Sequence, residues 1–495
     1  MNSLLALLIC VVGIAGLFYL DREKAAHISK AVWLPVIWLA IVGSRPVTAW
    51  LGQNTVYMSP DQLLDGSPLD RYIYEILLGL GITVLISRGR RARDFLWGSW
   101  PILLYFSYCL LSLFWSDYPE IVFKRWIKAL GDLVMVLIIL TDAEPAEAFK
   151  RFISRLGFVL LPASILLIKY FGDLGRAYDP DGDAMNVGVS TNKNSLGVIT
   201  LVIVLGALWN VLALLRDKQR IDRGRHLLAQ FTLLAFGFAL LEMAHSATCV
   251  ACFILGAGLI LANRFKIINN RPAAVHVLVF LMFLAGGFVA LGGGSVEVAH
   301  VLGRESNLTG RTDVWQAVIP VVPNPMIGAG FESFWLGPRL NRVWSRLSQY
   351  MHVNEAHNGY LEVYLNLGWV GIILMAFVLA KGYKDIVASF RHDSATGALL
   401  LAYLFGAIFY SITEAGFRLL NPMWIFLLFA IVAAGAAQGE GALQPVSTTG
   451  RKTELSANPA LPSGRFFPVG PEKHLPSANQ GHMGVAGGKE RSLSR

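Results

Sequence analysis

The residue types best suited to chemistry lie in residues 293–371, a long polar stretch in an otherwise apolar chain. Within it, Thr312 can cap a helix that begins at Asp313, and Pro320 ends that helix. Arg311 therefore lies at a predicted helix N-terminus, where backbone N–H groups have no partner within the helix.

A histidine precedes the next predicted helix. Asn358 is a residue type that caps helices, so an apolar helix is expected from Tyr360, with His357 at the water interface. Two helix N-termini, one beside a guanidinium and one beside an imidazole, would form a site for a polyanion, because free N–H groups and cationic side chains both bind phosphate. The residues alone thus predict an anion site at a membrane surface, which a lipid diphosphate would suit.

The same residues also have simpler interpretations. A single histidine at a membrane boundary is more often an interfacial residue than a catalytic one, and an arginine near a helix start is ordinarily an exposed charge. His352 and His357, with Glu355 between them, lack the spacing of a known metal site, so no metal is predicted. The Gly-rich run GAGFESF at 328–334 follows no predicted strand, so a turn is expected there.

A second helix is expected between these two points, over Phe331–Tyr350. This segment mixes apolar side chains with basic ones: Phe334, Trp335, Leu336 and Trp344 among Arg339, Arg342 and Arg346. The mixture predicts a helix that lies on the membrane surface, against lipid headgroups.

The rest of the chain predicts the scaffold that must position these residues. Of 495 residues, 55% are hydrophobic and 15% are charged, whereas a soluble domain carries about a quarter charged residues. Apolar runs of about 20 residues recur, each long enough to cross a bilayer. We therefore predict an all-α, polytopic membrane domain over residues 1–437, with about thirteen spans: 3–20, 31–51, 72–87, 99–115, 121–140, 152–170, 195–215, 227–243, 247–263, 275–292, 360–380, 397–412 and 420–437.

Loop charges predict the topology. Basic loops at 88–93, 216–226, 264–271 and 381–391 alternate with acidic or neutral loops at 52–71, 116–120, 171–194 and 293–359. Because Lys and Arg mark the cytoplasmic side, the large loop 293–359 is expected in the periplasm. The same loops explain the net charge of +9, so no nucleic-acid partner is predicted. Residues 438–495, rich in Gly, Pro, Ala and Ser, are expected to form a disordered cytoplasmic tail.

The four cysteines lie within apolar segments, so no disulfide framework is predicted. Cys249 and Cys252 form a CxxC, but no further Cys lies nearby, and helix packing is the expected role.

Five motifs resemble those of the O-antigen ligase and polymerase superfamily, and especially its exopolysaccharide polymerisation proteins. They are STNKNSLG (190–197), TGRTDVWQ (309–316), GAGFESFW (328–335), HNGYLEVYLNLGWVG (357–371) and SITEAGF (411–417). The resemblance covers about residues 190–420 and implies transfer of a polyprenyl-diphosphate-linked glycan to a sugar hydroxyl. It also implies an inverting enzyme of the bacterial inner membrane that needs no metal or other cofactor.

The resemblance implies roles for particular residues. Arg311 is similar to the family's essential loop arginine and His357 to its essential histidine. We expect Arg311 to stabilise the leaving diphosphate, because negative charge develops there. His357 is either the base for the acceptor hydroxyl or a hydrogen-bond donor to the diphosphate, and Glu414 is an alternative base. The expected substrate-binding residues are Lys193, Asn194, Asp313, Trp315, Asn358 and Tyr360, although interfacial aromatic belts give the same pattern.

One departure bears on the choice within the superfamily. Ligases carry a further arginine at the turn that corresponds to residues 243–252, where this chain has only His245, Ser246 and Thr248. This difference favours a polymerase over a ligase that attaches glycan to lipid A core. The expected partners are a lipid-linked oligosaccharide, a glycan acceptor and membrane lipids, with a chain-length regulator and a flippase as further ones.

Two other classes of protein are alternatives. A transporter of lipid-linked sugars would place charges at the bilayer midplane, whereas the polar residues here gather in one outer loop. A sensor or scaffold whose loop binds a partner is the third alternative.

Overall fold

The computed structural model describes residues 2–22, 28–52, 67–178, 182–220, 222–264, 276–277, 309–347, 353–390 and 392–436. The predicted span 275–292, apart from residues 276–277, lies outside these ranges. So do the first part of the large loop and the predicted tail 438–495.

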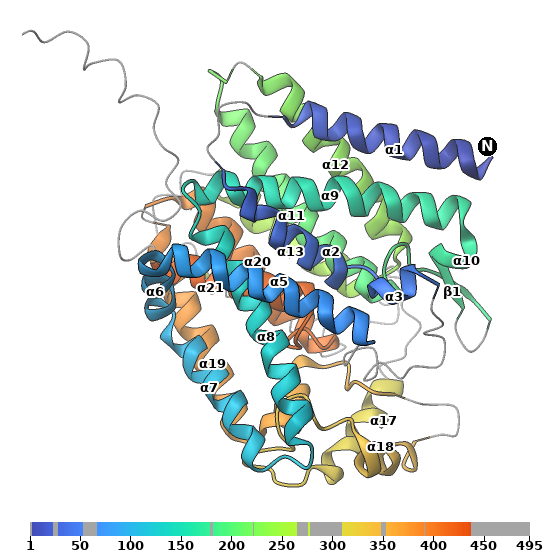
Figure 1. Ribbon diagram of the computed structural model, residues 1–495, viewed down its shortest axis with the longest axis vertical. Coiled ribbons are helices and arrows are strands. Elements are labelled where there is room, and N and C mark those ends of the chain that lie inside the picture. Colours follow the sequence, from blue (N-terminus) through green and yellow to red (C-terminus); the bar gives the residue numbers. More distant parts are fainter. Residues whose placement is uncertain are drawn as a thin grey trace, which may run out of the picture. The chain divides into compact units, whose positions relative to one another are not determined.

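Helices make up most of the described chain (Figure 1). The first group is α1 (Ser3–Leu20), η1 (Lys30–Val32), α2 (Trp33–Val42), α3 (Val47–Trp50), α5 (Pro68–Ser87), α6 (Gly89–Gly98), α7 (Trp100–Leu111), η2 (Ser112–Phe114), α8 (Pro119–Leu140), α9 (Pro145–Tyr170) and α10 (Gly172–Gly175). An antiparallel hairpin follows, in which β1 (Arg176–Tyr178) pairs with β2 (Ala184–Asn186). The second group is α11 (Lys193–Arg216), α12 (Arg223–Met243), α13 (Ala247–Ala262), α17 (Thr309–Val318), η3 (Ile319–Val321), α18 (Gly337–Trp344), α19 (Gly359–Ser389), α20 (Ser394–Thr413) and α21 (Pro422–Ala436).

Six of the described helices are long and apolar enough to cross a membrane: α1, α9, α11, α12, α19 and α20. A seventh span is possible if α6 and α7, which are bent by 87° at their junction, count as one. The other predicted spans within the described ranges also coincide with helices, but α2, α13 and α21 are shorter, and α5 and α8 carry more charge. The prediction of an all-α, multi-pass membrane protein is confirmed.

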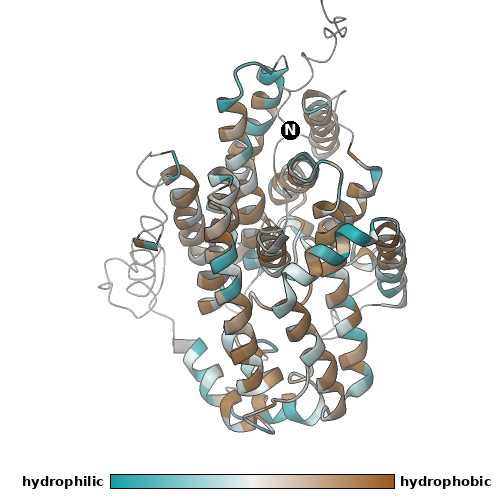
Figure 2. Cartoon of the chain, turned by 90° about the vertical axis from the view of Figure 1, so that its left-hand side faces the viewer, coloured by the Kyte–Doolittle hydropathy of each residue, from teal (hydrophilic) through white to brown (hydrophobic). Residues whose placement is uncertain are grey.

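The long helices differ in how deeply they are buried. In α20 and α11, 83% and 78% of the apolar window is buried inside the bundle, whereas in α1 the share is 11%. Hydrophobic residues cover the middle of the long helices, and hydrophilic ones gather at helix ends and in the connecting segments (Figure 2). α11 and α20 therefore form the centre of the bundle, and α1 presents its apolar side chains to lipid.

A break in α19 ties the large loop to the bundle. At Gly368 the backbone turns to φ +66°, and a side chain there would collide with the backbone of Met326. The carbonyl of Leu365, which the break leaves without its helical donor, accepts from the N–H of Ala329 (3.1 Å), and the N–H of Trp369 donates to the carbonyl of Pro325 (2.9 Å). The 325–330 turn thus completes the broken helix, as backbone groups at membrane depth require. The predicted turn at GAGFESF is confirmed.

The expected surface helix over Phe331–Tyr350 is wrong for most of its length. Within its described residues, 331–347, only α18 is helical. Residues 331–336 form turns, Gly337 has φ +52°, and Pro338 occupies the first helical turn. Phe334 and Trp335 are 0% and 2% exposed. They belong to a small core under the loop, formed by Val314, Ala317, Val318, Val321, Ala329, Phe334, Trp335, Leu340, Val343, Ala356 and Leu365. Their apolar surface faces protein, not lipid.

Candidate active site

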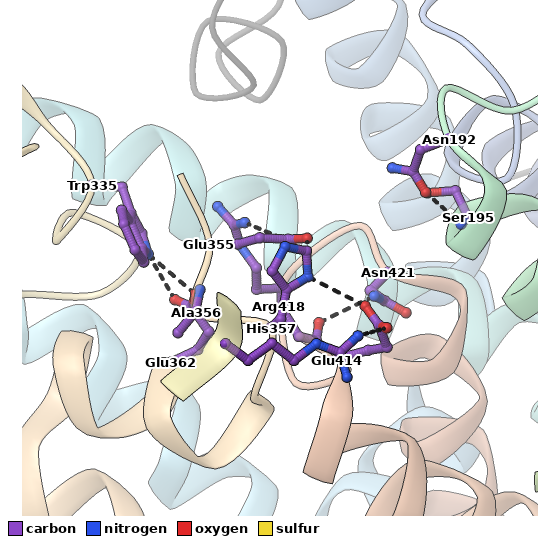
Figure 3. Close-up of polar contacts among 12 residues, drawn as sticks. Asn192, Ser195, Trp335, Glu355, Ala356, His357, Glu362, Glu414, Arg418 and Asn421 are labelled. Atoms are coloured by element: carbon purple, nitrogen blue, oxygen red, sulfur yellow. Dashed lines mark hydrogen bonds and ion pairs between the residues drawn. The ribbon is translucent and has the colours of Figure 1, made fainter. Parts of the chain in front are cut away.

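The Glu414 carboxylate contacts both Arg311 and His357, the two residues that the sequence singles out. Its Oε1 accepts from Arg311 Nη2 at 2.8 Å, and its Oε2 lies 3.4 Å from His357 Nδ1. The Glu414 side chain is 5% exposed, while Arg311 and His357 are 24% and 32% exposed. The carboxylate is therefore buried between two cationic groups that still reach solvent. Figure 3 shows His357 beside Glu414 and Glu355.

The ion pairs continue beyond this triad. Glu355 Oε1 lies 3.0 Å from His357 Nδ1, and Glu355 Oε2 lies 3.5 Å from Arg418 Nη1. Arg418 Nε is 3.2 Å from Glu332 Oε2, and both of these side chains are nearly buried. The result is a chain in which cations and carboxylates alternate: Arg311, Glu414, His357, Glu355, Arg418 and Glu332. We call these six residues the charge network.

Local structure explains how Glu414 and His357 meet. α20 ends at Thr413, and Glu414 follows in extended backbone. Asn358 caps α19 by accepting from Leu361 N–H (3.0 Å), and its Nδ2 donates to the carbonyl of Ile412 (3.1 Å). The predicted cap is confirmed, and its amide also joins the start of α19 to the end of α20.

Backbone strain marks the same place. Four non-glycine residues in the described chain have positive φ: His245 (46°), Glu332 (53°), His357 (47°) and Leu420 (54°). Two of these belong to the charge network, and Leu420 lies two residues from Arg418. Such conformations persist only where surrounding contacts enforce them, and they concentrate at functional sites.

A buried acid holds the segment that carries His357. Glu362 accepts from the N–H of Ala356 (2.5 Å) and from Trp335 Nε1 (3.0 Å). On the other side, Trp315 Nε1 donates to the carbonyl of Ala356 (2.8 Å). Ala356 is thereby fixed on both sides, which orients its neighbours Glu355 and His357.

The network shifts the pKa values of His357 and Glu355, which both lie outside the membrane-spanning helices. Burial alone would lower the pKa of His357, but its hydrogen bonds to Glu355 and Glu414 and their negative charges outweigh this and raise it to about 10. Burial opposes ionisation of Glu355, yet His357, Arg418 and Arg311 hold its pKa at about 2. At neutral pH His357 is therefore a cation that donates a hydrogen bond, and this disfavours it as the initial base.

The predicted helix start near Arg311 needs a correction. α17 begins at Thr309, so Thr312 is inside the helix and does not cap it. Arg311 lies in the first turn, and with Trp315, four residues later, it shares one face of the helix. Asp313 is exposed on a different side of α17, and the structure does not bring it into the charge network.

Lys193 and Asn194 lie in the first turn of α11, which Asn192 caps. One turn further along α11, Gly197 packs closely against Cys249 and Ser246 at the start of α13. Thr248 of α13 is hydrogen-bonded to Thr413 (2.8 Å), the neighbour of Glu414. The N-terminus of α11 is therefore linked to the Glu414 region through α13. The side chains of Lys193 and Asn194 themselves make no hydrogen bond or ion pair with any residue that the structure describes.

The predicted aromatic substrate residues have structural partners. Trp315 donates to Ala356, and Tyr360 Oη donates to the carbonyl of Ile408 (3.1 Å). Tyr360 also packs edge-on against Phe417. In this state both polar groups are used to hold the site together.

Sequence reasoning missed Arg418 and Glu332. Arg418 stands in the short segment between α20 and α21, four residues after Glu414, and a charge there between two apolar helices was the available signal. Glu332 lies in the GAGFESF run, and nothing in that run indicates that its carboxylate is 5% exposed.

Three of these groups have the types and spacing of metal ligands. One atom each from Glu355, His357 and Glu414 lies within 4.8 Å of the others. In the structure, however, guanidinium groups already neutralise both carboxylates, and His357 Nδ1 lies between them. The donor set therefore fits an internal ion-pair network at least as well as a metal.

Two comparisons with known proteins bear on the site. Residues 230–376 match the family model described as O-antigen ligase. Over 358 residues the chain is 26% identical to the exopolysaccharide production protein ExoQ of Rhizobium meliloti (strain 1021), and the alignment covers 68% of this chain and 76% of that protein. The family match includes Arg311 and His357, whereas Lys193, Glu414 and Arg418 lie outside it.

Proposed function

Because the chain resembles the O-antigen ligase family over residues 230–376 and ExoQ over most of its length, we propose that it polymerises a polysaccharide. Both comparisons support a membrane polysaccharide polymerase or ligase. The specific proposal is an inverting, metal-independent transfer of a polyprenyl-diphosphate-linked glycan to a sugar hydroxyl. The reaction takes place at the periplasmic face of a bacterial inner membrane.

The observation that carries this proposal is the bridging of Arg311 and His357 by Glu414. In the resting state the carboxylate occupies the two cations that a diphosphate would need. An incoming diphosphate, with its greater negative charge, replaces the carboxylate on Arg311 and His357. Glu414 is then released from its partners, next to the bound donor, as a base.

The transfer step follows from these positions. The acceptor hydroxyl oxygen attacks the anomeric carbon, the bond from that carbon to the diphosphate oxygen breaks, and the configuration inverts. The hydroxyl proton goes to Glu414, while Arg311 and protonated His357 stabilise the charge that develops on the leaving polyprenyl diphosphate. Lys193, at the N-terminus of α11, is proposed to assist with the diphosphate, and Asn194, Asp313, Trp315, Asn358 and Tyr360 to contact the sugars.

Two guanidinium groups in the network supply the positive charge that many glycosyltransferases take from a metal ion. Metal independence can be tested with the purified protein, because a chelator should leave the transfer rate unchanged. Loss of activity that a divalent ion restores would instead assign Glu355, His357 and Glu414 as ligands.

The turn between α12 and α13 supports polymerisation over ligation. It consists of Ala244, His245 and Ser246, and α13 begins beside Thr413. The arginine that ligases carry in this turn is absent from the sequence. The acceptor in this proposal is another repeat unit.

The test uses the full-length protein in vesicles with a polyprenyl-diphosphate-linked oligosaccharide, and resolves the products on a gel. Wild type should give a ladder of repeat units. Arg311→Ala should reduce the rate by roughly a hundredfold or more, as loss of a transition-state donor does elsewhere. Arg311→Lys should retain part of the rate, and His357→Ala should form no ladder of repeat units.

Gln316→Ala is the matched control, since Gln316 is exposed on α17 and lies outside the charge network. If the Arg311 and His357 variants form full-length polymer at normal protein level, the assigned site is wrong. If wild type elongates only a lipid A core acceptor, the protein is a ligase.

A further inference from the structure

A second charged region lies at the opposite end of α7 from the charge network. There, the junction of α5 and α6 and the turn between α8 and α9 enclose an open cavity of about 710 Å³. Its lining includes Ile86, Arg88, Arg90, Arg91 and Asp142. Three arginines thus face one cavity, and we call it the arginine cavity.

These arginines outnumber the acids beside them. Arg88 Nη2 pairs with Asp142 Oδ2 (3.1 Å), and Arg91 Nη1 donates to the backbone carbonyl of Asp142 (3.3 Å). The Arg90 side chain is exposed, and its guanidinium group makes no hydrogen bond or ion pair with any residue that the structure describes. With one carboxylate among the lining residues, the cavity has an excess of positive charge and suits an anion.

The Asp142 carboxylate is closed off from the cavity. Its side chain is 0% exposed, and Oδ2 is held by Arg88. Arg90 and Arg91 are therefore the charged groups that a ligand would meet, and they favour an anion.

The helix that carries Arg90 and Arg91 lies across the end of the bundle. α6 is bent by 87° from α7, with Ala92 and Phe95 buried and Trp97 exposed on the other side. A short amphipathic helix with arginines and an exposed tryptophan, set across the axis of a membrane helix, is typical of the lipid headgroup region. α6 also begins at the cavity, and the positive end of its dipole adds to the arginines.

An apolar surface runs from the cavity along α5. Ile86 lines the cavity and is 75% exposed, and Ile82, one turn earlier on the same face, is 44% exposed. An acyl chain could follow this surface into the bilayer. The surface favours a lipid over a free phosphate ion.

We propose that the arginine cavity binds the headgroup of an anionic phospholipid, such as phosphatidylglycerol. Arg90 and Arg91 contact the phosphate, and an acyl chain packs along Ile82 and Ile86. This site is independent of the proposed glycan transfer, because it uses none of the charge network.

The test reconstitutes the full-length protein in phosphatidylcholine vesicles that contain spin-labelled phosphatidylglycerol, and measures its preference over spin-labelled phosphatidylcholine. Each arginine near a membrane surface contributes about 1 kcal/mol to binding of anionic lipid, which is roughly fivefold. The double variant Arg90→Gln/Arg91→Gln should therefore lose about tenfold or more of the preference. Arg88 is left unchanged because it neutralises the buried Asp142.

Arg93→Gln is the matched control: it lies on the same helix, pairs with Asp94 (3.6 Å) and does not line the cavity. An equal loss in the control, or none in the double variant, would overturn the site, since only diffuse surface charge would then attract the lipid. Displacement of the lipid by millimolar inorganic phosphate, but not by chloride of equal ionic strength, would assign a soluble anion instead.

Discussion

The arginines at the two charged ends of the molecule differ in how fully they are paired with carboxylates. In the charge network, Arg311 and Arg418 each contact a carboxylate, and the Glu414 and Glu332 carboxylates are 5% exposed. In the arginine cavity, three arginines share one acid, and Arg90 is exposed with no partner that the structure describes. The arginines of the first region are paired within the protein, whereas the second region has an arginine that can still bind an anion.

This difference bears on how each region meets a ligand. At the charge network, a ligand must displace an existing ion pair, so binding and release of Glu414 are coupled. At the arginine cavity, a ligand can bind Arg90 without displacing an existing ion pair. Substitutions at the two ends should therefore differ in kind: the first should change chemistry and folding, and the second should change lipid preference alone.

The largest effect is expected from Glu414→Gln. The amide keeps the shape but cannot take the hydroxyl proton, so the transfer rate should fall by about 10² to 10⁴-fold, the range of general base catalysis. The measurement is the initial rate of polymer formation, with expression and melting temperature checked in parallel. Glu75→Gln, at an exposed pair with Arg71, is the control and should retain the wild-type rate. A Glu414→Gln variant with an unchanged rate would leave Glu414 a merely structural residue.

The pH dependence should distinguish the two roles of His357. Its pKa is raised from 6.5 to about 10, so it stays protonated through neutral pH. As a donor to the diphosphate it should support activity until the pH rises through about 10, with no step near 6.5. An activity that instead appears only as the pH rises through about 10 would identify His357 as the base.

The same shift predicts a trend in stability. A histidine whose pKa is raised in the folded state stabilises it fully below pH 6.5 and loses that contribution as the pH rises through about 10. The difference in melting temperature between wild type and His357→Asn should therefore shrink over this range. A difference that stays constant from pH 6 to pH 10 would contradict the ion pairs with Glu355 and Glu414.

Much of the scaffold could be predicted from sequence, because apolar runs and helix caps are local signals. The spans and the Asn358 cap depend on neighbouring residues only. The sequence predicts Glu414 as an alternative base, but its partners Arg311 and His357 lie 103 and 57 residues away in the chain. Such pairings depend on how the helices pack, and no spacing rule reports that.

The errors have similar causes. The expected surface helix over Phe331–Tyr350 was inferred from an amphipathic mixture, but the loop has its own core, which takes up Phe334 and Trp335. A sequence pattern shows that an apolar face needs a partner, and it does not say whether lipid or protein supplies it. Glu332 was missed because its environment is created by Arg418 from a distant segment.

A smaller effect, on stability, is expected from Arg418→Met. This change leaves the Glu332 and Glu355 carboxylates without their guanidinium partner, and loss of one member of a buried pair costs about 3–5 kcal/mol. The measurement is thermal unfolding in detergent. Arg71→Met, which breaks an exposed pair with Glu75, should cost much less, because water and salt screen that pair. Equal losses in the two variants would mean that the charge network behaves like a surface ion pair.

The smallest effect is expected from Arg90→Gln in vesicles of phosphatidylcholine alone. Arg90 has no partner that the structure describes, so without an anionic lipid its removal should change stability by no more than about 0.5 kcal/mol. Adding phosphatidylglycerol should then raise the melting temperature of wild type more than that of the variant, since only wild type gains the contact. A loss above about 1 kcal/mol in phosphatidylcholine would show that Arg90 already stabilises the fold. Both ends of the molecule would then be internally paired, and the contrast between them would fail.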